Sequence, residues 1–235
     1  MTIGLSHISF TYPGEKRPIF EDLTFQLKGP GFFSLFGLSG AGKSTLAQIL
    51  AGLLQPSSGR RVLPKPRPEV LYTHNGERLP VWEDCWQHLK SVTPPNGQRL
   101  LDEFLKTALH GVDLGVRFRE LSLGQKNRVN MARYIVQGFD CLIIDEALAN
   151  VDEPTRESIL RFLKESFPQR TFLYISHNIV EVARFSKVIY VLTSHRDHTP
   201  SMIKEVEGLD EAPDGGTKPS LIRERGLKIL EMASS

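Results

Sequence analysis

One stretch constrains the fold of this chain more than any other, and it reads Gly37-Leu38-Ser39-Gly40-Ala41-Gly42-Lys43-Ser44-Thr45. It fits the pattern G-x-x-x-x-G-K-[ST], in which the glycines let backbone N–H groups converge on phosphate oxygens. In that pattern Lys43 reaches the β- and γ-phosphates, and the Ser44 hydroxyl binds Mg²⁺. Residues 37–45 are therefore predicted to cradle a nucleoside triphosphate.

The segments on both sides of this loop have the order that such a site requires. Residues 31–36 form a short apolar run, which indicates a buried strand, and residues 46–51 are typical of a helix that stops at Gly52. This order places the positive end of the helix dipole at the phosphates. A chance glycine-rich turn is the alternative, and the full spacing and the context disfavour it.

The remaining segments predict an α/β fold. Residues 3–10 and 19–28 alternate apolar and polar side chains, as half-buried strands do. Short strand-like runs then follow at residues 69–73, 141–146, 171–176 and 188–192, separated by helical segments. Residues 202–206 are a possible edge strand in a polar segment. Strands that alternate with helices favour a parallel sheet. We expect a mostly parallel sheet with an N-terminal antiparallel β-subdomain and a small helical insert.

The 235 residues fit one domain over 1–235, with the helical insert at about 76–138 and a C-terminal tail at about 193–235. Residues 82–90 and 98–109 are the amphipathic segments of the insert, and helices that only pack the core are the alternative. The prolines between Gln55 and Pro68 exclude a central strand there, and residues 56–59 predict a turn.

The composition excludes several classes of protein. A net charge of +2, without a dense Lys/Arg cluster, argues against a nucleic-acid partner. Cys85 and Cys141 have no metal-site spacing and indicate a reducing compartment rather than a disulfide scaffold. No run approaches about 18 consecutive apolar residues, and the N-terminus lacks the pattern of a signal peptide. A link to a membrane would therefore come from another chain.

Further features accompany the phosphate loop in a fixed order. Tyr12 follows the first predicted strand, and residues 121–125 read Leu-Ser-Leu-Gly-Gln before a predicted helix. An apolar run then ends in Asp145 and Glu146, and His177 follows the next predicted strand. This ordered set resembles the ATP-binding cassette (ABC) ATPases over residues 3–192, which implies a P-loop NTPase core.

The resemblance implies a role for each of these side chains. Tyr12 would stack on adenine, with an ordinary turn-flanking aromatic as the alternative. Asp145 would hold Mg²⁺ together with Ser44, so that ATP and Mg²⁺ are the implied cofactors. Glu146 would orient or activate the attacking water, with a helix-capping or solvated acid as the alternative. His177 would contact the γ-phosphate and tie Glu146 to that water.

The resemblance also implies a second subunit. Ser122, Gly124 and Gln125 match the family's signature motif, which closes on the ATP held by the opposite subunit, and residues 149–152 match its dimer-interface loop. Hydrolysis would then need a head-to-tail dimer with two sandwiched nucleotides. The second cassette would be another copy of this chain or a paralogue.

Three positions depart from the family pattern. Leu123 stands where the signature usually has glycine, and Ala147 stands where proline usually follows the glutamate. Asn75, with His74 beside it, matches a glutamine that contacts Mg²⁺ and the membrane partner in the family. Asn75 is therefore a predicted metal-binding residue, although its side chain is one methylene shorter than that of glutamine. The helical insert is also short for the family.

The function that the resemblance implies is the ATPase subunit of a membrane transporter, of the bacterial importer type. The tail weakly resembles importers of nitrate, sulfonate and thiamine precursors. The expected partners are an integral membrane permease and a solute-binding protein, with this chain at the cytoplasmic face of the membrane. The alternatives are a soluble cassette ATPase in an assembly process such as iron–sulfur cluster biogenesis, and a slow nucleotide-switch regulator.

Overall fold

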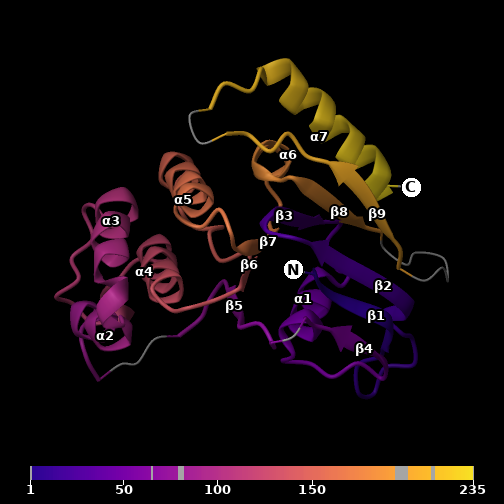
Figure 1. Ribbon diagram of the computed structural model, residues 1–235, viewed down its shortest axis with the longest axis horizontal. Helices are drawn as coiled ribbons and strands as arrows, with labels where there is room; N and C mark the ends of the chain where they lie inside the picture. Colours follow the sequence, from indigo (N-terminus) through magenta and orange to yellow (C-terminus); the bar gives the residue numbers. More distant parts are fainter. Residues whose placement is uncertain (1, 65, 79–81, 194–200, 213–214, 235) are drawn as a thin grey trace.

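The computed structural model in Figure 1 describes residues 2–64, 66–78, 82–193, 201–212 and 215–234, and its strands form two sheets. The smaller, antiparallel sheet has the order β2-β1-β4, with β1 at Thr2–Phe10, β2 at Phe20–Lys28 and β4 at Ser58–Val62. The larger sheet has the order β5-β6-β7-β3-β8-β9. Its strands are β5 (Val70–His74), β6 (Cys141–Asp145), β7 (Thr171–Ile175), β3 (Gly31–Phe36), β8 (Val188–Leu192) and β9 (Ile203–Glu207). All its neighbouring pairs are parallel except β8 and β9.

Every residue of β6 and β7 is buried, because both faces of the large sheet are covered. Leu142 and Phe172 pack with the helices on one face, whereas Ile143 and Leu173 pack toward the small sheet. Side chains of a strand alternate between its two faces, so a continuous apolar run is what a doubly covered strand needs. The α/β fold with a mostly parallel sheet and an antiparallel N-terminal sheet is confirmed.

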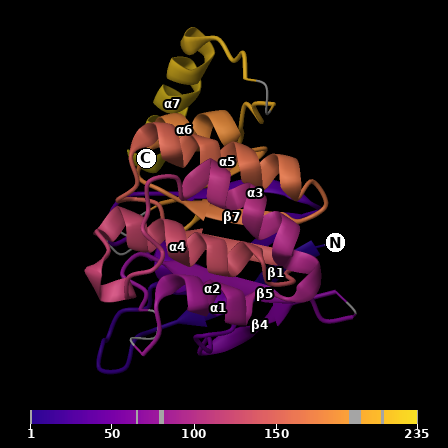
Figure 2. The same ribbon diagram turned by 90° about the vertical axis from the view of Figure 1, so that its left-hand side faces the viewer.

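Helices make up the remaining layers (Figures 1 and 2). The helix α1 (Lys43–Ala51) packs against β1, β5 and β6. On the opposite face lie α2 (Cys85–Val92), α3 (Gln98–Ala108), α4 (Leu123–Ile135) and α5 (Glu153–Ser166). The helices α6 (Ile179–Phe185) and α7 (Pro219–Ser234) pack together beside β8. Single 3₁₀ turns occupy Pro95–Gly97 and Phe118–Glu120.

Two local expectations differ from the structure. Residues 58 and 59 begin β4 rather than a turn, and β4 exists because it lies at the edge of its sheet, where it pairs with β1 alone. The first helix of the insert starts at Cys85, not at residue 82, because Asp84 caps it by accepting a hydrogen bond from the Gln87 backbone at 2.7 Å.

Candidate nucleotide-binding and hydrolysis site

The phosphate loop joins β3 to α1, as its flanks predicted. A side chain at Gly37 would place its Cβ 2.4 Å from the carbonyl oxygen of Leu192, because β3 lies directly beside β8. Gly42 adopts a φ of 96°, a left-handed conformation that favours glycine, and α1 begins at the next residue. The backbone N–H groups at the start of α1 therefore open toward the loop, which is the arrangement that binds phosphate at helix N-termini.

Lys43 lies folded over this loop. Its Nζ donates to the carbonyl oxygens of Gly37 at 2.9 Å and Leu38 at 3.1 Å, and the residue is buried. Burial lowers the pKa of Lys43, while the nearby charges of Glu146 and Asp145 act in the opposite direction. The buried ammonium group faces the two carboxylates across the site, and a triphosphate would bring it additional negative charge.

Asp145 has a buried carboxylate that is suited to bind a cation. It lies at the C-terminal end of β6 and is only 5% exposed, and its Oδ2 accepts a hydrogen bond from the Tyr72 hydroxyl at 2.7 Å. Its Oδ1 is buried and has no hydrogen-bond partner. A buried carboxylate oxygen without a partner is costly, so it calls for a bound cation or water. Ser44 lies on the wall of the same cavity, and hard oxygen ligands of this kind fit Mg²⁺.

That cavity has a volume of about 520 Å³ and lies between α1, β5 and the end of β6. It is lined by Ser44, Gln48, Leu53, Tyr72, His74, Asn75, Glu77, Tyr134, Asp145 and Glu146. Gln48, Tyr72, Glu77 and Tyr134 were not predicted as site residues. Tyr72 had a signal, since it lies near the C-terminal end of a predicted parallel strand. Burial raises the pKa of Tyr72 far above its ordinary value, so the hydroxyl stays protonated and donates to Asp145.

Glu146 and His177 form a pair at the mouth of the site. The Glu146 Oε1 lies 2.7 Å from His177 Nε2, because β6 and β7 are neighbours and each residue follows the end of its strand. Glu146 has a φ of 53°, which is strained for a glutamate. Its backbone N–H donates to the Ile175 carbonyl at 3.0 Å, and this bond helps to hold the conformation. A second cavity of about 140 Å³ adjoins the pair, lined by Glu146, Ala149, Arg156, Tyr174, Ser176, His177 and Asn178.

Tyr12 lies beside the phosphate loop. Its hydroxyl shares a 2.9 Å hydrogen bond with the Thr45 hydroxyl, and its ring packs edge-on against Phe10 at 4.9 Å. The residue is 39% exposed, so part of the ring is free. An aromatic surface next to bound phosphates is suited to stacking with a base.

The predicted signature residues lie elsewhere, at the start of α4. Ser122 and Gln125 form a reciprocal capping box, and neither they nor Gly124 line the two cavities described above. A Cβ on Gly124 would lie 2.4 Å from the Asn150 carbonyl oxygen, so the loop at residues 147–152 packs directly onto this helix start. Leu123 is 47% exposed. The structure therefore separates this motif from the chain's own phosphate loop.

Asn75 connects the first cavity with that loop and with α4. Its side-chain oxygen accepts hydrogen bonds from the amides of Asn150 at 2.8 Å and Asn127 at 3.3 Å. Its backbone N–H donates to the Asp145 carbonyl at 3.2 Å. Asn75 lines the first cavity, and the side-chain oxygen that was predicted to face the metal accepts hydrogen bonds from two other asparagines.

Comparisons with known proteins show which family this chain resembles. The family model described as "ABC transporter" matches residues 20–149. The energy-coupling factor transporter ATP-binding protein EcfA2 of Clostridium tetani is 27% identical, over 98% of this chain and 92% of its own length. The chloroplastic ABC transporter I family member 11 of Arabidopsis thaliana is 31% identical, over 77% of this chain and 74% of its own length.

Solved structures share the fold. The dimeric post-hydrolysis state of the ATP-binding cassette MJ0796, bound to ADP and Pi, aligns with a TM-score of 0.73 and 21% identity, over 87% of this chain and 98% of that one. Within the described residues, no helix has the length and hydrophobicity that crossing a membrane requires. The family match over more than half of the residues, the fold and the relatives together show that this chain belongs to the ABC transporter family, as one of its ATPase cassettes.

Proposed function

We propose that this chain is the ATP-hydrolysing subunit of a membrane transporter that imports a solute. The observation that carries the catalytic part is the Glu146–His177 pair at 2.7 Å, placed beside the unpartnered Asp145 oxygen. A nucleophile-orienting carboxylate and a cation-binding carboxylate are the two acids that phosphoryl transfer to water requires.

The proposed mechanism assigns one task to each group. The N–H groups of residues 37–45 and the Lys43 ammonium hold the triphosphate, and Tyr12 stacks on the adenine. Ser44 and Asp145 would hold Mg²⁺, with Asn75 on the wall of the same cavity. The bound ion would neutralise charge on the β- and γ-phosphates.

Glu146 then accepts a hydrogen bond from the attacking water and aligns it with the γ-phosphorus atom. His177 holds the Glu146 carboxylate from one side and reaches the γ-phosphate from the other. Full deprotonation of the water in advance is unnecessary, because in-line positioning supplies most of the rate gain.

A second cassette completes the site in this proposal. Ser122, Gly124 and Gln125 line neither of the two described cavities, and Leu123 presents its side chain to solvent. A head-to-tail dimer, with another copy of the chain or a paralogue, would place this helix start on the partner's nucleotide. ATP would then favour the closed dimer and hydrolysis the open one.

The membrane side of the proposal rests on the helical insert and on the relatives. We assign the chain to one domain over 1–235, with the insert at about 76–138 and the tail at about 193–235. In the insert Trp82 is 77% exposed beside α2, and tryptophan is enriched in the interfaces between proteins. The partner would be an integral membrane permease, with this chain bound at the cytoplasmic face.

Import is favoured by one named relative. The molybdenum import ATP-binding protein ModC of Photorhabdus laumondii is 29% identical over 80% of this chain and 58% of its own length. A solute-binding protein would deliver the solute. Human antigen peptide transporter 2 is matched over only 30% of its length. We propose no nucleic-acid partner.

Co-purification and turnover test this function together. The chain should release phosphate from ATP in the presence of Mg²⁺, and Glu146→Gln should abolish turnover while ATP binding and dimerisation persist. Glu165→Gln, which neutralises an exposed acid on α5, is the matched control and should keep full activity. Tagged protein should co-purify with an integral membrane protein from detergent extracts. A soluble partner in its place would refute transport and favour an assembly ATPase.

A further inference from the structure

A buried polar cluster lies directly behind His177. Its centre is Glu181 on α6, which is 4% exposed. The Glu181 Oε2 accepts a hydrogen bond from the Tyr174 hydroxyl at 2.8 Å, and its Oε1 accepts from the Asn178 amide at 3.0 Å and from Arg156 Nε. One carboxylate thus connects β7, the residue after His177, and α5.

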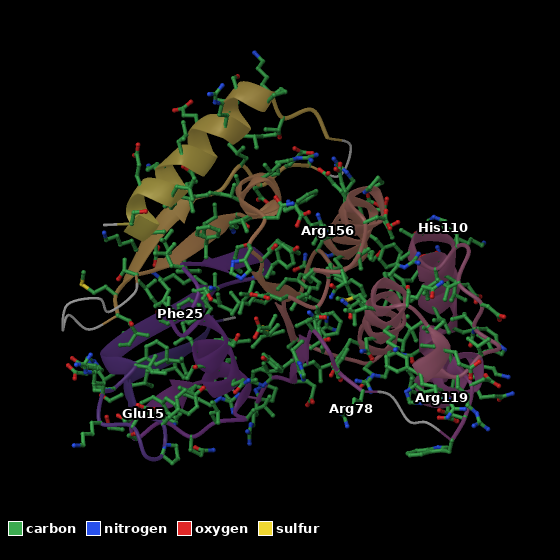
Figure 3. All side chains as sticks on the ribbon, turned by 180° about the vertical axis from the view of Figure 1, so that it is seen from behind. Glu15, Phe25, Arg78, His110, Arg119 and Arg156 are labelled. Carbon is green, nitrogen blue, oxygen red and sulfur yellow. The ribbon has the colours of Figure 1, made fainter. Side chains whose placement is uncertain are left out.

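Arg156 extends this cluster to the loop at residues 147–152. From the first turn of α5 its Nη1 donates to the Val151 carbonyl at 2.7 Å, while its Nε is paired with Glu181 (Arg156 is labelled in Figure 3). The guanidinium is planar, so its two nitrogens hold both partners in a fixed relative orientation. The position of the loop backbone is therefore set by the same side chain that holds Glu181.

Asn178 connects Glu181 with the segment that contains His177. Its side-chain oxygen accepts from the backbone N–H groups of Val180 at 3.1 Å and Glu181 at 3.3 Å, which caps α6. Its own N–H donates to the Ser176 hydroxyl at 3.1 Å. The residue that follows His177 is thereby locked on both sides, and a displacement of Glu181 would move His177.

The two segments that this cluster joins both contact the proposed reaction site. His177 lies 2.7 Å from Glu146, and the loop at residues 147–152 touches Gly124 and Asn75 through Asn150. A buried ion pair contributes little net stability compared with a well-packed apolar pair, so stability alone gives little reason for a charged pair at this place. The charged hydrogen bonds of Arg156 have a preferred geometry, so they link Glu181 to the loop in a fixed orientation that apolar packing would not supply.

We propose that Glu181 is a positioning residue that couples His177 to the loop at residues 147–152 through Arg156. Closure of that loop against the second cassette and alignment of His177 with Glu146 then occur as one movement. The inference deepens the proposed function, because the closing movement belongs to the proposed dimer.

The test uses the full-length chain and compares turnover with binding. Glu181→Gln keeps the size of the side chain and its contacts with Tyr174 and Asn178, and it removes the charge that pairs with Arg156. We expect kcat to fall by roughly 10- to 100-fold, the cost of misplacing a reacting group by about 1 Å, while the Kd for ATP changes less than twofold. In a Glu146→Gln background, the added Glu181→Gln should weaken ATP-dependent dimerisation.

Glu211→Gln is the matched control. Glu211 is 4% exposed, like Glu181, and it pairs with Arg161 of α5 and Arg184 of α6. It is therefore an equally buried glutamate whose ion pairs involve the same two helices. This variant should lose stability and keep the wild-type kcat. The inference is overturned if Glu181→Gln keeps kcat within twofold of wild type, or if Glu211→Gln loses the same kcat.

Arg156→Lys keeps the test decisive if Glu181→Gln does not fold. Lysine retains a positive charge for Glu181 but lacks the fork that also reaches Val151, so kcat should fall with ATP affinity intact, and an unchanged kcat overturns the coupling. The wild-type chain tests the proposed function separately from the coupling. A wild-type chain without ATPase activity or dimerisation would refute the function itself, whereas a selective change in the variants tests only the coupling.

Discussion

Gly124 allows a sharp test of how closely the loop at residues 147–152 packs on α4. In Gly124→Ala the new Cβ would lie 2.4 Å from the Asn150 carbonyl oxygen. The backbone itself accepts alanine, because Gly124 lies in the first turn of α4 and does not have a positive φ. The steric effect on the loop is therefore the main consequence of the substitution.

Two opposing terms set its size. Alanine is favoured over glycine in a helix by about 1 kcal/mol, whereas an added methyl group in a tight contact costs about 1–3 kcal/mol. The net change in the free energy of unfolding should stay below about 2 kcal/mol, a shift of roughly 8 °C or less for a chain of this length. To restore ordinary van der Waals contact at 3.4 Å, the loop must retreat by about 1 Å.

Turnover should respond far more than stability. A displacement of about 1 Å in a segment that closes the reaction site lowers kcat by up to roughly 100-fold. The assays are thermal unfolding and steady-state phosphate release with Mg²⁺ and ATP. Gly138→Ala is the control, since its Cβ would meet nothing within 4 Å. The reasoning fails if Gly124→Ala keeps kcat within threefold of wild type, or if Gly138→Ala is equally inactive.

Three further predictions follow from single side chains. Tyr72→Phe removes the donor to Asp145 Oδ2, so the free energy of unfolding in urea should fall by about 1–3 kcal/mol, and a change below about 0.5 kcal/mol would contradict this. Glu146→Gln should raise the dimer fraction at saturating ATP in analytical ultracentrifugation, and a monomer there would exclude the sandwich. The hydrogen bond from Arg184 lowers the pKa of Glu211 from 4.5 to about 2. Because the pKa is lowered in the folded state, this stabilisation is present above about pH 4.5 and is lost as the pH falls toward 2. In Glu211→Gln the free energy of unfolding should therefore fall less steeply between pH 5 and pH 3 than in the wild type. Equal slopes for the two proteins would contradict this.

Short-range features of the chain were enough to predict the strand, loop and helix that carry the proposed site residues. The phosphate loop at residues 37–45 is contiguous, and its glycines, lysine and flanking apolar run act within one strand–loop–helix unit. Asp145 ends β6 and Glu146 follows it, and the apolar run of this strand indicates that both its faces are buried. The start of α5 is likewise a local feature, because the Asp152 side chain accepts a hydrogen bond from the Thr155 backbone at 3.0 Å.

Contacts between distant segments depended on the order of the strands, which no local pattern encodes. Tyr72 reaches Asp145 because β5 lies beside β6, although 73 positions separate them in the sequence. The edge strand β4 exists because β1 offers it a partner, against its own unfavourable composition. Local residue patterns determine which backbone shapes are allowed, and long-range pairing determines which side chains meet.

The same division separates the two halves of the proposed site. Lys43, Asp145 and His177 converge around one phosphate loop because the parallel strands β3, β6 and β7 end at a common edge. Tyr12 reaches the same loop from the small antiparallel sheet, through its hydrogen bond with Thr45. Gly124 lies at the start of α4, where a Cβ would come within 2.4 Å of the Asn150 carbonyl oxygen, and only the folded chain shows this contact. The sequence motif assigned Gly124 to the partner's nucleotide, whereas its packing against the loop at residues 147–152 depends on tertiary structure.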